Sequence, residues 1–129
     1  MHNLRSSKYT LNPKIAIVVV VCTLTANTIA CRSRGIDVTI RNDGQTTIRN
    51  VEFDYPGAAF GTGSIAPGAS YSYRVKPLSR GEVSLSFEQE NGKTFKQKGP
   101  TLVANTDGRL VIVVEQDVAK QWRMRVEQQ

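Results

Sequence analysis

Histidine and cysteine are nearly absent from this chain. His2 is the only histidine, and the two cysteines, Cys22 and Cys31, both lie in the first 31 residues. Nucleophilic triads need an imidazole and zinc sites need several His or Cys ligands, so the rest of the chain lacks the side chains for either. It also cannot form an internal disulfide, and its stability must come from a packed core. We therefore expect a protein that is not an enzyme and has no metal or other cofactor.

Acidic residues are missing from the first 31 positions, and this part of the chain has the pattern of an export signal. Arg5, Lys8 and Lys14 form a basic head, and an uncharged run follows from Ile15 to Cys31. The apolar core of the run, about ten residues long, suits insertion into a membrane, and the small residues after it mark a cleavage site. We expect residues 1–31 to be a signal peptide or membrane anchor, a hydrophobic helix that sends the rest of the chain out of the cytoplasm.

The end of this run leaves three products open. It resembles a bacterial lipoprotein signal, in which the cysteine after a small residue is acylated, and Ala30 and Cys31 occupy those positions. Cleavage after Ala30 by the ordinary signal peptidase would instead release a secreted domain, since Thr28 and Ala30 form a small-x-small site. An uncleaved helix is the third alternative, although 17 uncharged residues at about 1.5 Å each span roughly 25 Å, short of the ~30 Å hydrocarbon core. We favour a product held at the membrane through its N-terminus.

The formal charge of +6 overstates how basic the exported part is. Three basic residues belong to the signal, so 14 Lys and Arg stand against 11 Asp and Glu from Cys31 onward. A balance of +3 over 99 residues is an ordinary surface charge and lacks the basic stripe of a nucleic-acid binder. Nucleic acid is therefore not an expected partner, whereas anionic lipid or a cell-wall polymer is compatible with this charge. The length suits one domain.

Helical periodicity is missing from Ile36 to Glu115, where strand patterns take its place. Seven segments show apolar and polar alternation or a short apolar run: 36–41, 51–55, 60–65, 71–75, 83–87, 94–98 and 110–114. Ile48 is out of phase with the second segment, which indicates a bulge near Asn50. Asn91-Gly92 predicts a type I′ hairpin. The uniformly apolar segment 110–114 predicts a central strand, and 60–65, with its two glycines, an edge strand.

About seven short strands separated by turns predict an all-β fold, an antiparallel β-sandwich in residues 32–115. Between Val38 and Phe87 the chain resembles the immunoglobulin-like modules of bacterial surface proteins, including the adhesion-related type. The matching features are Val-x-Ile-x-Asn-Asp-Gly from Val38, Ile-Arg-Asn-Val from Ile48, Ile-Ala-Pro-Gly from Ile65 and Gly-x-Val-x-Leu from Gly81. Antibody domains differ, because their cysteine pair and core tryptophan are absent here. The resemblance implies an accessory or binding module.

Two groups within the predicted strands are candidates for binding. Lys93, Lys96 and Lys98 crowd one arm of the predicted hairpin, where they either form a binding surface or protect an edge strand from pairing with neighbours. Four aromatic residues would stack on sugar rings if exposed, but their alternation with small polar residues favours core positions. These are Tyr55, Phe60, Tyr71 and Tyr73.

The segment 116–129 is the third candidate and forms a C-terminal extension beyond the last predicted strand. It combines Trp122 with Arg123 and Arg125. Its apolar residues recur at a spacing of four, which suits a short helix capped by Asp117, and also at a spacing of two, which suits a strand. A basic segment with a tryptophan either docks on anionic lipid or a partner, or covers an open sheet edge.

These features together predict a non-catalytic β-sandwich that is exported, held at the cell envelope and engaged with another envelope protein. The alternative from a different class is a carbohydrate or cell-wall binding module, motivated by the tyrosines and the mild positive charge. Catalysis by the acidic pair Glu88 and Glu90 is the least favoured reading, because both residues are better explained as solvated residues next to a hairpin turn.

Overall fold

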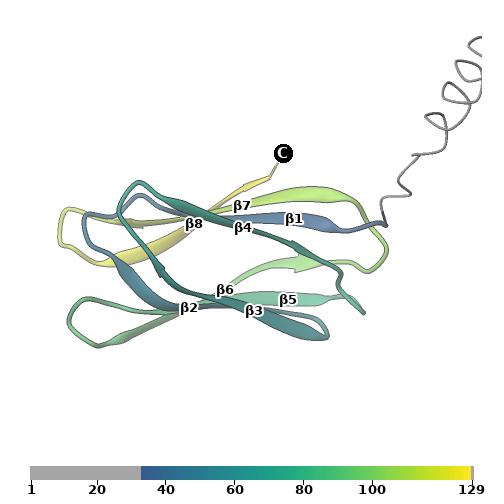
Figure 1. Cartoon of the computed structure of the whole chain (residues 1–129), viewed down its shortest axis with the longest axis horizontal. Coiled ribbons are helices and arrows are strands. Elements are labelled where there is room, and N and C mark those ends of the chain that lie inside the picture. Colours follow the sequence, from purple (N-terminus) through teal and green to yellow (C-terminus); the bar gives the residue numbers. More distant parts are fainter. Residues whose placement is uncertain (1–32, 129) are drawn as a thin grey trace, which may run out of the picture. The chain divides into compact units, whose positions relative to one another are not determined.

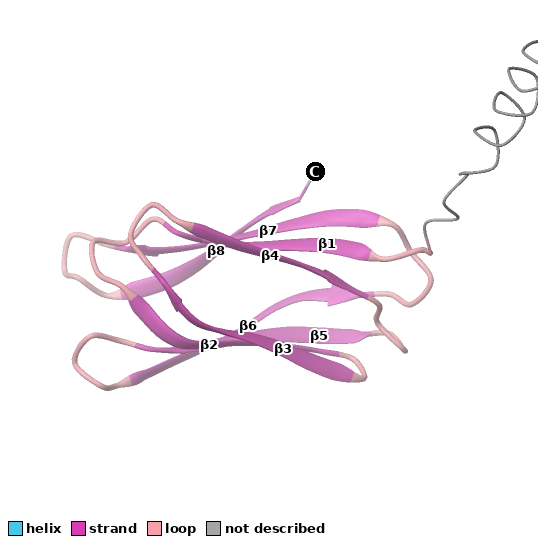
Figure 2. Ribbon diagram, in the orientation of Figure 1, coloured by secondary structure: helices cyan, strands magenta, loops and turns pink. Residues whose placement is uncertain are grey.

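The computed structural model describes residues 33–128, and eight β-strands make up this part of the chain (Figure 2). They are β1 (Ile36–Asn42), β2 (Ile48–Tyr55), β3 (Ala58–Ile65), β4 (Ser70–Val75), β5 (Gly81–Glu88), β6 (Thr94–Leu102), β7 (Gly108–Gln116) and β8 (Trp122–Gln128). None of the described residues is helical, so the predicted all-β class is confirmed. The expected signal helix, with Ala30 and Cys31, lies outside the described residues.

The strands form two four-stranded sheets packed face to face (Figure 1). The first has the order β4-β1-β7-β8 and the second β3-β2-β5-β6. One pairing contradicts the predicted antiparallel arrangement, because β1 and β7 run parallel, with Ile36 opposite Gly108 and Asn42 opposite Val114. Alternation determines which face of a strand is buried, but it carries no information about the direction of a neighbour that is distant in sequence. The prediction was therefore wrong for this pair.

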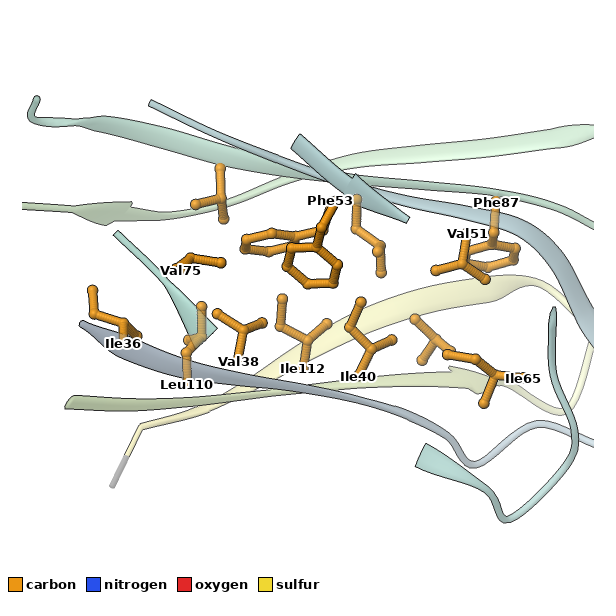
Figure 3. Packing of buried hydrophobic residues seen from close by; sticks show 14 of the residues in the cluster. Ile36, Val38, Ile40, Val51, Phe53, Ile65, Val75, Phe87, Leu110 and Ile112 are labelled. Carbon is orange, nitrogen blue, oxygen red and sulfur yellow. The ribbon is translucent and has the colours of Figure 1, made fainter. Parts of the chain in front are cut away.

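Inward-facing apolar side chains from both sheets make one core (Figure 3). In β1 the residues Ile36, Val38 and Ile40 are buried and alternate with half-buried polar residues. Phe53 of β2 and Phe87 of β5 are the largest of the fully buried side chains. Burying one large apolar side chain contributes about 1.5–3 kcal/mol. This core supplies the stability that a domain without disulfides needs.

β7 is the central strand that its uniformly apolar sequence predicts, since it lies between β1 and β8. Its alternate residues face the core, yet Val113 on the opposite face is also fully buried. The cross-strand neighbours of Val113 are Arg41 and Arg125. Long arginine side chains cover apolar surface with their methylene groups while the charged ends stay in water. Both faces of β7 are therefore covered at Val113, although no further strand or helix among residues 33–128 lies on its outer face.

The C-terminal extension is a strand and not a helix. As β8 it pairs antiparallel with β7 along its length and covers that strand's open edge. Asp117, the candidate helix cap, instead closes the β7–β8 turn by accepting hydrogen bonds from the backbone N–H groups of Ala119 and Gln121. This segment supplies the eighth strand, one more than the sequence pattern predicts.

Two local predictions for the second sheet have different outcomes. The bulge is confirmed, because the register between β2 and β5 shifts around Asn50, whose φ is 47°. The type I′ hairpin is wrong, because Gly92 has a positive φ of 80° while Asn91 does not. The side chain of Asn91 instead accepts a hydrogen bond from the N–H of Lys93. The N–H of Gln89 donates to the backbone oxygen of Lys93 at 2.8 Å, so the three residues 90–92 form the tight part of the connection, with Gly92 in the left-handed position.

The loops gather at two opposite ends of the molecule (Figure 1). The chain enters β1 at the end that also holds the β2–β3, β4–β5 and β6–β7 connections. The other end, called the distal end below, holds the β1–β2, β3–β4, β5–β6 and β7–β8 loops. A strand rises about 3.3 Å per residue, so the seven residues of β1 separate the two ends by roughly 23 Å.

Candidate functional site

Asn42, at the distal end of β1, is a fully buried polar residue that holds two chain segments together. Its Nδ2 donates hydrogen bonds to the backbone oxygens of Thr46 and Ile65, each at 2.9 Å. Its Oδ1 accepts a hydrogen bond from the N–H of Gly44, also at 2.9 Å. A polar side chain is stable in the interior only when its hydrogen bonds are satisfied. These three bonds fix the β1–β2 loop against the end of β3.

A pocket of about 330 Å³ opens at the distal end. The β1–β2, β5–β6 and β7–β8 loops and the strand ends beside them line it with Gln45, Thr46, Gln89, Glu90, Asn91, Gln116, Lys120 and Trp122. A neighbouring hollow of about 200 Å³ shares Gln45, Gln116 and Lys120 with it. Sites for small molecules commonly have volumes of about 300–1,000 Å³. The pocket is thus large enough for a small ligand.

Trp122 forms the aromatic wall of this pocket and is half-buried. Its ring meets Phe87 edge-on, with ring centroids 5.2 Å apart and an angle of 76° between the planes. A Cβ atom at Gly44 would lie only 2.3 Å from Cη2 of the indole, so glycine at this position lets the ring approach the backbone. Within residues 33–128 the indole N–H makes no hydrogen bond and is not sealed from solvent.

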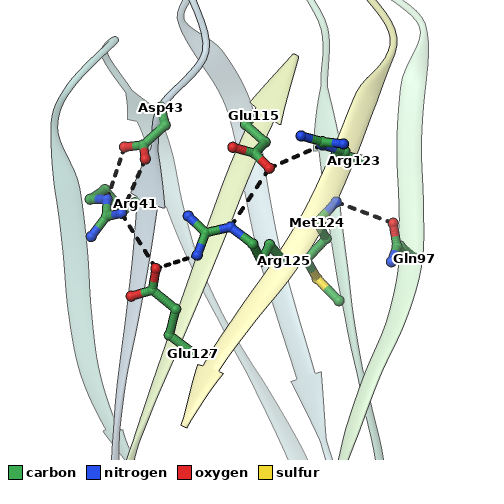
Figure 4. Close-up of polar contacts among 8 residues, drawn as sticks. All are labelled: Arg41, Asp43, Gln97, Glu115, Arg123, Met124, Arg125 and Glu127. Carbon is green, nitrogen blue, oxygen red and sulfur yellow. Dashed lines mark hydrogen bonds and ion pairs between the residues drawn. The ribbon is translucent and has the colours of Figure 1, made fainter. Parts of the chain in front are cut away.

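Arg123 and Arg125 alternate with Trp122 along β8 and therefore point to the opposite face of the sheet. Nε of Arg123 lies 3.0 Å from Oε1 of Glu115, and Nε of Arg125 lies 3.7 Å from the same oxygen (Figure 4). Arg125 also contacts Glu127. The sequence suggested that the tryptophan and the two arginines act as one basic segment. The structure instead separates the tryptophan from both.

Charges on this outward face are balanced around a short ion pair. Nε of Arg41 donates to Oδ1 of Asp43 at 2.8 Å. This hydrogen bond, aided by the arginine charge and partly opposed by burial, lowers the pKa of Asp43 below its ordinary value of 3.8. The same bond raises the pKa of Arg41. The ion-pair network in Figure 4 has no local excess of positive charge that would attract an anionic surface. Its three basic and three acidic side chains are Arg41, Arg123, Arg125, Asp43, Glu115 and Glu127.

The three candidate lysines lie along one outer edge of the second sheet. Lys93 stands in the β5–β6 turn, and Lys96 and Lys98 are exposed on β6, the edge strand. Nζ of Lys98 lies 3.2 Å from Glu82 in an exposed pair, which contributes little to stability. Gln97 reaches across to β8, where its Oε1 accepts a hydrogen bond from the N–H of Met124 at 3.3 Å (Figure 4). This arrangement fits lysines that protect an edge from pairing.

The opposite side of the molecule, formed by β3 and β4, carries the aromatic residues. Phe60 of β3 is buried, and Tyr73 of β4 stacks on it with ring centroids 4.6 Å apart. Tyr55 and Tyr71 are partly buried against the core, as their alternation favours. Tyr73 keeps 45% of its surface exposed, so the core position that alternation favours is wrong for this residue, which lies on the edge strand β4. This side therefore combines packing aromatics with one aromatic ring that solvent reaches.

Sequence reasoning missed the glutamines of the pocket, Gln45, Gln89 and Gln116. A weak signal exists, because each stands within two residues of a residue type common in turns, namely Gly44, Asn91 or Asp117. Which turns meet at one end depends on the strand order, and alternation does not provide it. The part of the chain that the structure describes contains no cluster of three or more His, Cys, Asp or Glu side chains suited to a metal ion. No helix in the same part is long and apolar enough to cross a membrane.

Comparisons with known proteins find a protein of similar fold but no family to which the chain belongs. No family model matches the chain, and no curated protein matches it either. A protein from Eubacterium rectale, solved by NMR, has a similar structure, with a TM-score of 0.58 over 74% of this chain and 91% of its own. The likeness is one of fold alone. At 15% sequence identity it indicates that this arrangement of strands occurs in a solved protein and carries no information about activity.

Proposed function

We propose that this chain is an exported, non-catalytic module of the immunoglobulin-like sandwich type that binds another envelope protein. The N-terminus holds it at the envelope, through a lipid on Cys31 or a retained helix. One observation supports protein binding above the others: the β3 edge of the second sheet is long, uncharged and open, and it lies beside the exposed ring of Tyr73.

The four edge strands differ in how they are protected. β6 carries the charged residues Lys96 and Lys98. On β8 the backbone N–H of Met124 already donates a hydrogen bond to the side chain of Gln97. β4 carries Arg74, whose Nη1 lies 2.9 Å from Asp37. β3 has eight residues and no charge, proline or such cross-edge bond among the described residues. Exposed edges pair readily with another chain unless charge, proline or a cover prevents it. A partner that adds an extended strand to β3 would gain main-chain hydrogen bonds and contact Tyr73.

A matched pair of lysine substitutions tests this edge. Ala59 on β3 pairs with Asp54, and Thr101 on β6 pairs with Glu82, so each new lysine would face an acidic cross-strand neighbour. We expect Ala59→Lys to reduce recovery of a crosslinked envelope partner about tenfold, because a charge at the edge opposes pairing. Thr101→Lys serves as the control and leaves recovery unchanged. Absence of any specific partner for the wild type would refute the function, and equal recovery with both variants would refute the edge.

The anchor is tested separately by the intact mass of the protein recovered from its native envelope. A mass that corresponds to Cys31 at the N-terminus plus acyl chains, and that is lost in Cys31→Ser, supports the lipid anchor. A full-length mass supports the retained helix. An unmodified mass that begins at Cys31 contradicts both and indicates a secreted domain.

A second candidate function, a carbohydrate or cell-wall binding module, draws on a different part of the molecule. Two of the three tyrosines no longer support it, since Tyr55 and Tyr71 pack against the core and only Tyr73 is exposed. The observation that favours it is the distal pocket with Trp122 on its wall. Sedimentation with insoluble peptidoglycan tests the polymer-binding form of this function, and a protein that stays in the supernatant contradicts it.

A further inference from the structure

We infer that the distal pocket is a binding site for a neutral saccharide, whose hydroxyl groups meet the carboxamide side chains while a sugar ring packs against Trp122. The inference rests on the second candidate function, carbohydrate binding, and not on the proposed binding of a protein at the β3 edge, because the two sites use different residues.

The walls of the pocket are held in place before any ligand arrives. Asn42 fixes the β1–β2 loop. In the β5–β6 loop the N–H of Gly92 donates to the backbone oxygen of Gln89 at 2.9 Å. Asp117 closes the β7–β8 turn with two hydrogen bonds from backbone N–H groups. A site with walls already ordered loses less conformational entropy when a ligand binds, so more of the contact energy appears as affinity.

Several polar groups on the rim have no partner within residues 33–128. The side chains of Gln45 and Gln89 make no hydrogen bond there, and neither does the indole N–H of Trp122. Gln116 is partly committed, since its Oε1 accepts a hydrogen bond from the N–H of Gln45 at 3.2 Å. A carboxamide both donates and accepts hydrogen bonds, and so does a hydroxyl group. The pocket is therefore complementary to a ligand with many hydroxyl groups.

Charge and polarity disfavour phosphates, acidic polymers and wholly apolar ligands. Glu90 and Lys120 contribute one charge of each sign, so the pocket has no basic excess for a phosphate or an acidic polymer. A wholly apolar ligand would bury carboxamides without partners, which is unfavourable. A single aromatic wall beside several carboxamides suits a sugar, whose ring has C–H groups on its faces and hydroxyl groups at its edge.

Trp122 is the only tryptophan of the chain, so the fluorescence of the full-length protein reports on the pocket directly. We would titrate the full-length chain in detergent with maltotriose, cellotriose and tri-N-acetylchitotriose. We expect a saturable change in emission with one or more of these sugars. Gln45→Ala and Gln89→Ala should each weaken that binding about threefold to tenfold, because each removes one or two hydrogen bonds. Thr101→Ala on β6 is the control and should bind as the wild type does.

Three outcomes would overturn the inference. The first is a flat titration with all three sugars, and the second is unchanged affinity in both glutamine variants when their thermal unfolding matches the wild type. The third is a response to tetraglycine without a response to any sugar, which would make the pocket a peptide site. Ala59→Lys separates this inference from the proposed function, because it should reduce partner capture and leave sugar affinity unchanged.

Discussion

Removal of the buried amide of Asn42 should destabilise the domain strongly. Asn42→Ala deletes three hydrogen bonds, each with a net contribution of about 1 kcal/mol. The change also leaves the carbonyl oxygens of Thr46 and Ile65 without this partner, at a cost of about 1–3 kcal/mol for an oxygen that stays buried. We expect a total loss of about 3–5 kcal/mol, a large part of the roughly 5–15 kcal/mol that stabilises a typical domain.

Urea unfolding of the full-length chain, followed by Trp122 fluorescence, measures this loss as a lower midpoint with an unchanged slope. Thr47→Ala is the control, because Thr47 is exposed in the same loop and its side chain makes no hydrogen bond within the described residues. It should change stability by less than about 0.5 kcal/mol. Asn42→Asp keeps the acceptor for Gly44 but places a buried carboxylate against the backbone oxygens of Thr46 and Ile65, so at neutral pH it should destabilise at least as much as Asn42→Ala. A loss below about 1 kcal/mol in Asn42→Ala would refute the role given to this residue.

The remaining predictions concern the same end of the molecule and its edges. Gly44→Ala should displace Trp122, lower the free energy of unfolding by about 1–3 kcal/mol and shift the emission maximum. Gly108→Ala is the control and should not destabilise, because a new Cβ there meets nothing within 4 Å. Equal effects in the two variants would contradict the close approach of the indole ring to Gly44. Because the pKa of Asp43 is lowered in the folded state, its contribution to stability is complete above the ordinary pKa of 3.8 and is lost as the pH falls through the lower, folded value. In Arg41→Gln the NMR titration midpoint of this carboxyl should rise, and an unchanged midpoint would contradict the assigned cause. Gln97→Ala should speed exchange of the Met124 amide hydrogen, and unaltered exchange would show that the edge bond does not protect it.

The parts of the fold that follow from local pattern were predictable from the sequence. Alternation in β1 gave the buried face, and the out-of-phase Ile48 located the bulge at Asn50. The apolar run in β7 indicated a central strand, and the glycines of β3 an edge. Each of these depends on the side chains of one segment and the solvent around it.

Features that depend on which segments meet were not predictable. The parallel pairing of β1 with β7 joins strands about seventy residues apart, and nothing in either segment specifies the other's direction. Asn42 has the residue type of an ordinary turn former, and only the neighbouring end of β3 makes it a buried anchor. The pocket has the same origin, because its three walls come from loops that only the completed sheets bring together. The candidate site is therefore a property of the topology.

The position of β1 has a mechanical consequence. β1 is hydrogen-bonded on both sides, to β4 over six residue pairs and to β7 over seven. In a chain held by its N-terminus, as proposed, a pull from a ligand at the distal end acts along β1. The bonds of the two ladders lie across that direction, so they would resist in shear and share the force, instead of opening one after another. Because β1 directly follows the proposed N-terminal anchor in the chain, it would let the module transmit tension while it stays folded.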